Sequence, residues 1–329
     1  IGKLNKTGTA KMLSITNTGS GSGIRIINDA VNNNISYCKL AASNIINPGG
    51  VVYLATAAVT GNDNNTIEYN DINALGSANG INSVGTATFE NSGNKILNNN
   101  IFDFYINNTS TTITNGINIG ANNTEWTISG NSLYQTAPRA YAATATFHYG
   151  IFYSSGVNNI VENNYIGGSA PLAGGSPWTV TGGLGRPVGM YTQGGTTAPS
   201  SIQGNVITNY DITTDYVTNA SSAFIGHWHT SGAVNVGTIT GNTIGSTTTA
   251  GAIKIKFNSA AVGPLVVGIN LSTAAGVSMV FSNNKIGGII VDFNNTTNRG
   301  HFYAVSTSGA GAVTFTNNIV GSTTVPNSI

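Results

Sequence analysis

A six-residue pattern recurs along the whole chain: an apolar residue, two further residues, Asn, one further residue and a second apolar residue. Its copies occupy residues 67–72, 96–101, 128–133, 161–166, 202–207, 239–244, 281–286 and 315–320. A weaker first copy lies at residues 30–35, around Asn33. Repeats spaced by roughly 20 to 50 residues are typical of solenoids, because one unit cannot bury its apolar side alone and must stack on the next.

A second pattern alternates with the first and consists of Gly, an apolar residue, any residue and another apolar residue. It begins at Gly23, Gly50, Gly80, Gly116, Gly150, Gly189 and Gly268, with degenerate copies at 224–229 and 302–305. Both patterns are short, rich in β-branched residues and bounded by Gly or Asn, as strands are. No stretch follows the helical period over a useful length. The chain is therefore predicted to be all-β, a right-handed parallel β-helix solenoid of about nine coils, with 1–329 as a single domain.

Stacking places equivalent residues of successive coils about 4.8 Å apart. The apolar residue after each Asn should then form one inward stack, made of Ile72, Ile101, Leu133, Ile166, Ile207, Ile244 and Ile286. The Asn itself is expected at a sharp bend, where it tolerates a left-handed backbone and its amide bonds to the Asn of the next coil. These residues are Asn70, Asn99, Asn131, Asn164, Asn205, Asn242 and Asn284. The Gly should supply a bend where side chains would collide.

The composition excludes several classes of protein. Only 7% of the residues are charged and the net charge is +1, against roughly 25% charged residues in an ordinary soluble domain. Nucleic acid and anionic membrane surfaces are therefore not expected as partners. No apolar run reaches about 18 residues, so membrane insertion is not expected. Hydrophobic residues make up 40% of the chain and are spread along it, which argues against disorder.

The ends of the sequence and its single cysteine give further expectations. The chain begins at Ile1, without Met or a signal peptide. Since a surface of Asn, Thr and Ser with little charge is typical of extracellular proteins, we expect a fragment of a longer secreted or cell-surface protein. Cys38 is expected to be a buried small apolar residue and excludes internal disulfides. Neither end has a visible cap, so we expect the coil ends to contact further parts of the same polypeptide or a secretion or surface partner.

The Asn-x-Ile bends, with Gly-Ile strands between them, resemble the right-handed parallel β-helix superfamily typified by pectate lyases. They are especially similar to the Asn-rich β-helix repeats of large surface proteins from Bacteroidota. The resemblance covers the whole chain. It implies the fold and leaves the activity open, because that superfamily includes lyases, hydrolases, phage tailspikes and adhesins.

The arc from each Asn to the next Gly-Ile strand varies most in length, and insertions in solenoids map to loops on one face, often the binding face. Its longest members are residues 134–149, 167–188 and 210–229, on consecutive coils. Aromatic, His and Arg side chains gather there. The candidate carbohydrate-binding groove consists of Arg139, Tyr141, His148, Trp178, Arg186, His227 and His229. Alternatively, these side chains only anchor the long loops.

A metal site at the two neighbouring histidines is not favoured. His227 and His229 are two residues apart on a strand-like segment and share a face. We expect both to be exposed and Trp228 to point inward. Asp215 is the only obvious further ligand, whereas a zinc site needs a third and a fourth. We therefore predict neither a metal nor a cofactor.

Catalysis by paired carboxylates is also not favoured. Asp211 and Asp215 would lie about 13 Å apart on an extended strand, and the remaining acidic residues are scattered. We predict a structural and adhesive β-helix segment of a large exported protein that binds glycans along one face. The alternative is a polysaccharide lyase or glycoside hydrolase of the β-helix superfamily.

Overall fold

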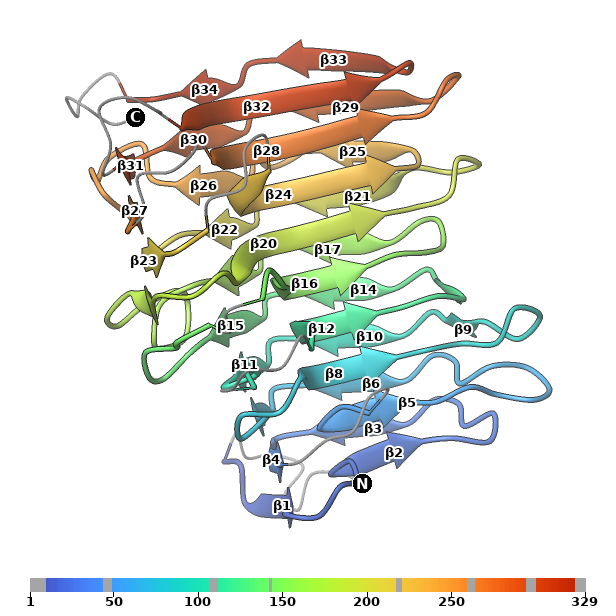
Figure 1. Cartoon of the computed structure of the whole chain (residues 1–329). Helices are drawn as coiled ribbons and strands as arrows, with labels where there is room; N and C mark the ends of the chain where they lie inside the picture. The colour runs from blue at the N-terminus through green and yellow to red at the C-terminus, as the bar shows by residue number, and fades with distance from the viewer. Residues whose placement is uncertain are drawn as a thin grey trace.

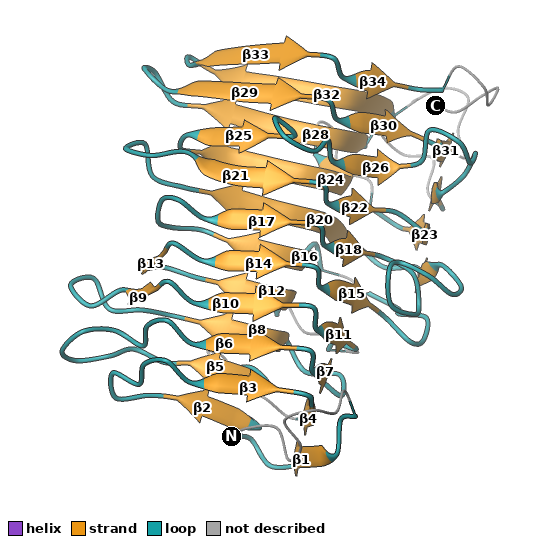
Figure 2. Ribbon diagram, turned by 180° about the vertical axis from the view of Figure 1, so that it is seen from behind, coloured by secondary structure: helices purple, strands orange, loops and turns teal. Residues whose placement is uncertain are grey.

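The computed structural model describes residues 10–43, 49–106, 112–141, 144–216, 221–258, 264–293 and 300–322. These residues form strands and loops, and none of them is helical. Three long parallel sheets enclose one core, so the chain is an all-β parallel β-helix solenoid, as predicted (Figure 1, Figure 2). Over the described ranges, no helix is present that is long and apolar enough to cross a membrane.

Sheet A holds the strands that follow the Asn of each repeat. In spatial order these are β1 (Leu13–Asn17), β4 (Cys38–Ala42), β7 (Asp71–Asn73), β11 (Asn100–Phe102), β15 (Ser132–Tyr134), β18 (Tyr165–Ile166), β22 (Val206–Ile207), β26 (Thr243–Gly245), β30 (Lys285–Gly287) and β34 (Ile319–Val320).

Sheet B holds the strands with the Gly pattern, and sheet C holds those that precede the Asn. Sheet B comprises β2 (Ile24–Ile26), β5 (Val52–Leu54), β8 (Asn79–Ser83), β12 (Thr114–Ile119), β16 (Phe147–Tyr153), β20 (Arg186–Gln193), β24 (Ser222–Ser231), β28 (Leu265–Thr273) and β32 (His301–Gly309). Sheet C comprises β3 (Asn34–Ser36), β6 (Thr66–Glu68), β10 (Lys95–Leu97), β14 (Thr127–Ser129), β17 (Ile160–Glu162), β21 (Ser200–Gln203), β25 (Val234–Val236), β29 (Ser278–Ser282) and β33 (Ala312–Thr316).

Two smaller sheets lie on the arcs between the long ones. A side sheet forms on the variable arc and comprises β19 (Trp178–Thr181), β23 (Tyr210–Thr214), β27 (Ile253–Phe257) and β31 (Ile289–Phe293). A short pair, β9 (Asn91–Ser92) and β13 (Asn123–Thr124), lies on the arc between sheets B and C.

Each coil passes through sheet B, sheet C and sheet A in that order. Sheet B runs from left to right on the near side of Figure 1, and Figure 2, the view from behind, shows sheet C running back on the far side. The chain climbs from its first coil at the bottom to its last coil at the top, so the coils are right-handed, as parallel crossovers almost always are. Sheets B and C have nine strands each among the described residues, which matches the predicted number of coils.

The apolar residues after the repeated Asn form one inward stack, as predicted. Neighbours such as Ile72 and Ile101, or Leu133 and Ile166, are paired in register in sheet A. Every predicted member is at most 1% exposed, namely Ile72, Ile101, Leu133, Ile166, Ile207, Ile244 and Ile286.

The repeated Asn residues form a continuous ladder of amides, also as predicted. The backbone N–H and Nδ2 of Asn164 both donate to Oδ1 of Asn205 in the next coil, at 3.1 and 2.9 Å. Nδ2 of Asn164 donates in addition to the backbone oxygen of Ile128, at 2.9 Å. The same bonds link Asn70, Asn99, Asn131, Asn164, Asn205, Asn242, Asn284 and Asn318. Along the ladder, each Asn therefore donates its backbone N–H and Nδ2 to the Asn of the next coil and accepts on Oδ1 from the previous coil.

The left-handed backbone predicted for the ladder Asn belongs to the residue before it, so that part of the prediction is wrong. Tyr69, Asn98 and Asn163 have φ of 55°, 53° and 54°, and each precedes a ladder Asn that is not in this region. The chain reverses one residue earlier, because the Asn side chain must point inward to bond along the stack.

The first coil departs from the pattern. Cys38 is buried, as predicted, and its backbone N–H donates to Oδ1 of Asn70 at 2.9 Å, so cysteine takes the ladder position. Asn33 instead starts a second, shorter ladder, in which it donates to Asn65 and Asn65 donates to Asn94. Asn33, predicted as the Asn of a weak first copy of the pattern, is therefore not equivalent to the Asn of the later copies.

The Gly pattern marks a change of face within sheet B. Tyr149 belongs to a cluster outside the sheet, whereas Ile151 belongs to the core. Residues two apart on a regular strand share a face, so the strand must turn at Gly150, as predicted. The core is also thin here, since a Cβ on Gly116 would lie 2.5 Å from Cδ2 of Leu133.

Candidate functional site

Three residues of the predicted groove meet around Tyr105. The Tyr141 and His148 rings stack with centroids 4.1 Å apart, and the Tyr105 ring lies 5.3 and 5.6 Å from them. The Arg139 guanidinium lies 5.5 Å from the Tyr105 centroid and pairs with Asp103. Tyr141 and His148 are buried, and burial lowers the pKa of His148 to about 3. Their ring faces are therefore occupied by one another.

Trp178, another residue of the predicted groove, lies in the core. It is 3% exposed, stacks on Tyr210 with centroids 5.2 Å apart, and meets Phe104 edge to face at 5.5 Å. Since β19 and β23 pair Trp178 with Tyr210 in register, the side sheet continues the core outward into the variable arc. This placement corresponds to the anchoring role that was the alternative reading.

The two neighbouring histidines also lie inside the solenoid. Oγ1 of Thr192 is 2.9 Å from Nε2 of His227 and 2.9 Å from Nδ1 of His229. Nε2 of His229 lies 3.1 Å from the backbone oxygen of Gly232. Burial lowers the pKa of His227 to about 3 and that of His229 to about 4. Both rings are therefore neutral near pH 7, and three of their four nitrogens lie within hydrogen-bond distance of Thr192 or Gly232.

The prediction that both histidines are exposed and Trp228 points inward is wrong. His227 pairs in register with Met190 and takes the inward position that follows the Gly of the repeat. His229 is then also inward, and Trp228 between them faces outward and is half-buried. The signal was present in the sequence, because Gly226-His227 aligns with Gly189-Met190.

The outward side chains of sheet B form a second apolar cluster, separate from the core. We call Phe147, Tyr149, Phe152, Tyr191 and Trp228 the outer aromatic cluster. They come from β16, β20 and β24, which are consecutive strands on the near side of Figure 1. All but Tyr149 are half-buried, so each presents part of its ring to solvent.

The rings of this cluster hold one another in place. Phe152 and Tyr191 stack with centroids 4.6 Å apart and an interplanar angle of 12°. Trp228 meets Tyr191 edge to face at 5.3 Å, and Tyr149 lies beneath, 5.0 Å from Phe152. Offset and edge-to-face pairs of this kind are the favoured aromatic geometries.

Arg186, a predicted groove residue, belongs to the edge of this cluster. Its guanidinium lies 4.0 Å from the Phe147 centroid and 5.1 Å from that of Tyr216. Its Nε donates to the backbone oxygen of Ser222 at 2.6 Å. Burial lowers the pKa of Arg186. Of the seven predicted residues, Arg186 is the one that the structure places beside the outer aromatic cluster.

Polar groups border the cluster. Oη of Tyr191 donates to Oε1 of Gln193 at 3.1 Å, and Oγ1 of Thr230 donates to Oη of Tyr191 at 2.9 Å. One coil before Phe152, its register partner Asn118 donates through Nδ2 to Asn82 at 2.9 Å. Amides and hydroxyls therefore stand next to the exposed parts of these rings.

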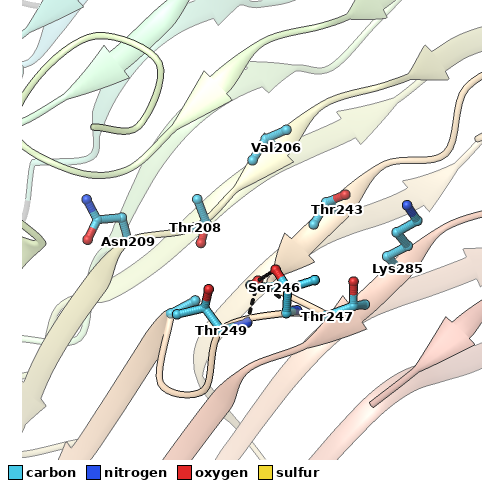
Figure 3. A pocket seen from close by; sticks show the side chains of 11 residues that line it. Val206, Thr208, Asn209, Thr243, Ser246, Thr247, Thr249 and Lys285 are labelled. Atoms are coloured by element: carbon cyan, nitrogen blue, oxygen red, sulfur yellow. Dashed lines mark hydrogen bonds between the residues drawn. The ribbon is translucent and has the colours of Figure 1, made fainter. Parts of the chain in front are cut away.

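A hydroxyl-lined hollow of about 570 Å³ lies on the outer face of sheet A. Figure 3 shows Thr208, Thr243 and Lys285 around it, with the 246–249 turn closing one side. Oγ of Ser246 accepts the backbone N–H groups of residues 248 and 249 at 3.1 and 3.0 Å, which fixes that turn. The hollow contains no aromatic side chain.

A second hollow of about 450 Å³ lies nearer the N-terminal end of the same face. The stacked rings of Phe102 and Tyr134, with centroids 5.2 Å apart, form part of its wall. Nδ2 of Asn100 donates to Oδ1 of Asp71 at 2.7 Å, so this amide and this carboxylate of the hollow's wall are engaged with each other.

Several carboxylates have structural partners. Asp103 pairs with Arg139, and Asp71 pairs with Lys11. Asp215 accepts the backbone N–H of residue 183 at 2.6 Å. Within the described residues, no group of three or more His, Cys, Asp or Glu side chains is placed to hold a metal ion.

Fold and surface together define a parallel β-helix solenoid with the outer aromatic cluster on the outer face of sheet B. No protein-family model matches the chain, and neither a curated protein nor a solved structure is significantly similar to it.

Proposed function

We propose that this chain is a rigid segment of an exported, cell-surface protein that binds a glycan on the outer face of sheet B. The observation that carries the proposal is the outer aromatic cluster. Its half-buried rings lie on three consecutive strands and are held by ring contacts. Exposed apolar patches bordered by polar groups mark interaction sites.

The geometry favours sugars over other ligands for three reasons. Aromatic side chains pack against the apolar face of a sugar ring, and Phe152, Tyr191 and Trp228 lie side by side and half-buried, so part of each ring remains accessible. The bordering amides and hydroxyls, including Gln193 and Thr230, suit the hydroxyl groups of a sugar. The outer aromatic cluster spans roughly 10 Å across three strands, which suits a short stretch of a longer glycan.

The rest of the molecule supports an extended scaffold role. Parallel ladders pair the backbone groups of each interior coil with both neighbours, which makes the solenoid stiff. The low charge content, 7%, suits an extracellular surface. These features, with the Asn-rich repeats, support assignment to the pectate-lyase-like β-helix superfamily and to Bacteroidota surface proteins.

Cleavage of a polysaccharide by a lyase or hydrolase of that superfamily is the alternative. In a hydrolase, paired carboxylates would have to act as acid and base. Asp71 and Asp103 are paired with Lys11 and Arg139, which gives these two carboxylates a structural role instead.

A glycan array, followed by titration calorimetry with the best glycan, tests the proposal. Affinity is expected on the order of micromolar to millimolar for a small open site. Tyr191→Ala should weaken binding at least about tenfold while the circular dichroism spectrum stays unchanged. Tyr53→Ala is the matched control, because Tyr53 lies on β5 of the same sheet, away from the cluster.

Three results would contradict the proposal. The first is that no glycan binds. The second is that Tyr191→Ala and Tyr53→Ala weaken binding equally. The third is that the array shows cleavage of a polysaccharide, which favours the enzyme alternative instead.

A further inference from the structure

The Asn ladder has a direction, and its last described member has an open side. Asn318 accepts the backbone N–H and Nδ2 of Asn284, at 2.9 and 3.1 Å, and its own Nδ2 donates to the backbone oxygen of Phe281 at 2.9 Å. Every earlier member also donates its backbone N–H and Nδ2 to an Oδ1 in the following coil. Among the described residues, no coil follows Asn318 to offer that oxygen.

The apolar core is open at the same end. Phe315 and Val320 are 43% and 51% exposed, whereas Phe281 and Ile286, one coil below, are 1% and 0% exposed. Phe315, Val320 and Val305 line a hollow of about 480 Å³. Among the described residues, β32, β33 and β34 are the last strands of their sheets, and no described strand pairs with their outer edges.

The N-terminal end of the ladder is chemically different. Cys38 holds the ladder position of its coil, and Leu13 is in register with it one coil below. Neither side chain has a carbonyl oxygen. At the N-terminal end, the ladder thus ends in Cys38 and Leu13, whose side chains offer no amide acceptor. At the C-terminal end, it ends in Asn318, whose backbone N–H and Nδ2 are hydrogen-bond donors.

We propose that the C-terminal end binds a further β-helix coil that carries Asn at the ladder position and apolar residues at the inward positions. The Oδ1 of that Asn accepts both open donors of Asn318, and the inward residues cover Phe315 and Val320. A second copy of this chain does not meet the requirement, because stacking it head to tail would place Leu13 over Asn318. The partner is thus a coil that continues the solenoid.

The test extends the full chain with one coil copied from its own sequence. One extension carries residues 77–106, which include Asn99, and a matched extension carries Asn99→Leu in the copy. Hydrogen exchange at the Asn318 backbone amide is measured by NMR. The Asn-bearing copy should slow this exchange about tenfold more than the leucine copy, the effect of one additional buried hydrogen bond.

A second pair of extensions guards against a copied coil that fails to fold. It uses residues 112–141, with Asn131 or with Asn131→Leu in the copy. Equal protection by Asn and Leu copies in both pairs, or no protection by any of the four, overturns the proposal. Concentration-dependent self-association of the unextended chain that protects Asn318 overturns the choice of partner.

Discussion

Gly150 of sheet B faces Ile166 of sheet A across the core, and a Cβ on this glycine would lie 2.6 Å from Cγ2 of Ile166. The same Cβ would lie 2.6 Å from the backbone oxygen of Gly189 in the next coil. Gly189 in turn faces Ile207, and a Cβ on Gly189 would lie 2.7 Å from Cγ2 of Ile207. The two sequence repeats are therefore two sides of one contact, because a large residue after the Asn requires a facing strand without a side chain.

Gly150→Ala is expected to destabilise the fold by about 1–3 kcal/mol, the usual cost of overfilling a packed core. Gly19→Ala is the matched control, because a Cβ there meets only the Asn17 side chain, at 3.3 Å. Urea unfolding measures both. Equal unfolding midpoints for the two variants would contradict the close approach of the sheets.

Asn164→Ala removes the acceptor of two hydrogen bonds donated by Asn131. The buried donors then have no partner, and the expected cost is about 1–3 kcal/mol. Asn235→Ala, on the outer side of β25, should change the free energy of unfolding by less than about 0.5 kcal/mol. If several ladder variants unfold at the same urea concentration as the parent, the ladder does not stabilise the fold.

The interior histidines should make the fold sensitive to acid. The pKa values of His227 and His229 fall from 6.5 to about 3 and about 4 because of burial, so the unfolded chain binds more protons below pH 6.5. The stability linked to the neutral rings is thus fully present above this pH and is lost as the pH falls toward 3.

His227→Met tests this dependence, since Met190 fills the same inward position one coil earlier. The variant should lose less stability than the parent between about pH 7 and pH 4, as measured by urea midpoints. An identical loss in both proteins would show that other groups control the acid response.

Trp178→Ala should cost about 3–5 kcal/mol, because it removes a large side chain packed between Phe104 and Tyr210. The glycan affinity of the variant that remains folded should stay within about twofold of the parent value. Thermal unfolding and calorimetry measure the two effects separately. Lost binding with unchanged stability would instead place the glycan at Trp178.

The fold was predictable because equivalent residues of successive repeats pair with one another in register. The spacing of Asn99 and Asn131 and the Ile or Leu two residues later specify both the register and the inward face. The Gly pattern added the place where sheet B changes face. Departures from the repeats were harder to place, and Cys38 at a ladder position was missed because nothing in its residue type resembles Asn.

The candidate site was less predictable, because clustering of aromatic and His residues does not reveal which way they point. Residue type and loop length predict that Trp178 and His227 are exposed. The position directly after the Gly of the repeat faces the core whatever its residue type. His227, which follows Gly226, therefore points inward and Trp228 points outward. The side sheet, which carries Trp178 into the core, follows from tertiary pairing that no local pattern specifies.

Fluorine NMR of protein labelled with 5-fluorotryptophan tests the proposed function most directly. The chain has three tryptophans, of which Trp126 and Trp178 lie in the core and Trp228 lies in the outer aromatic cluster. Individual Trp→Phe variants assign the three signals. On titration with the bound glycan, only the Trp228 signal should shift. A shift of the Trp178 signal with Trp228 unchanged would contradict glycan binding on the outer face of sheet B.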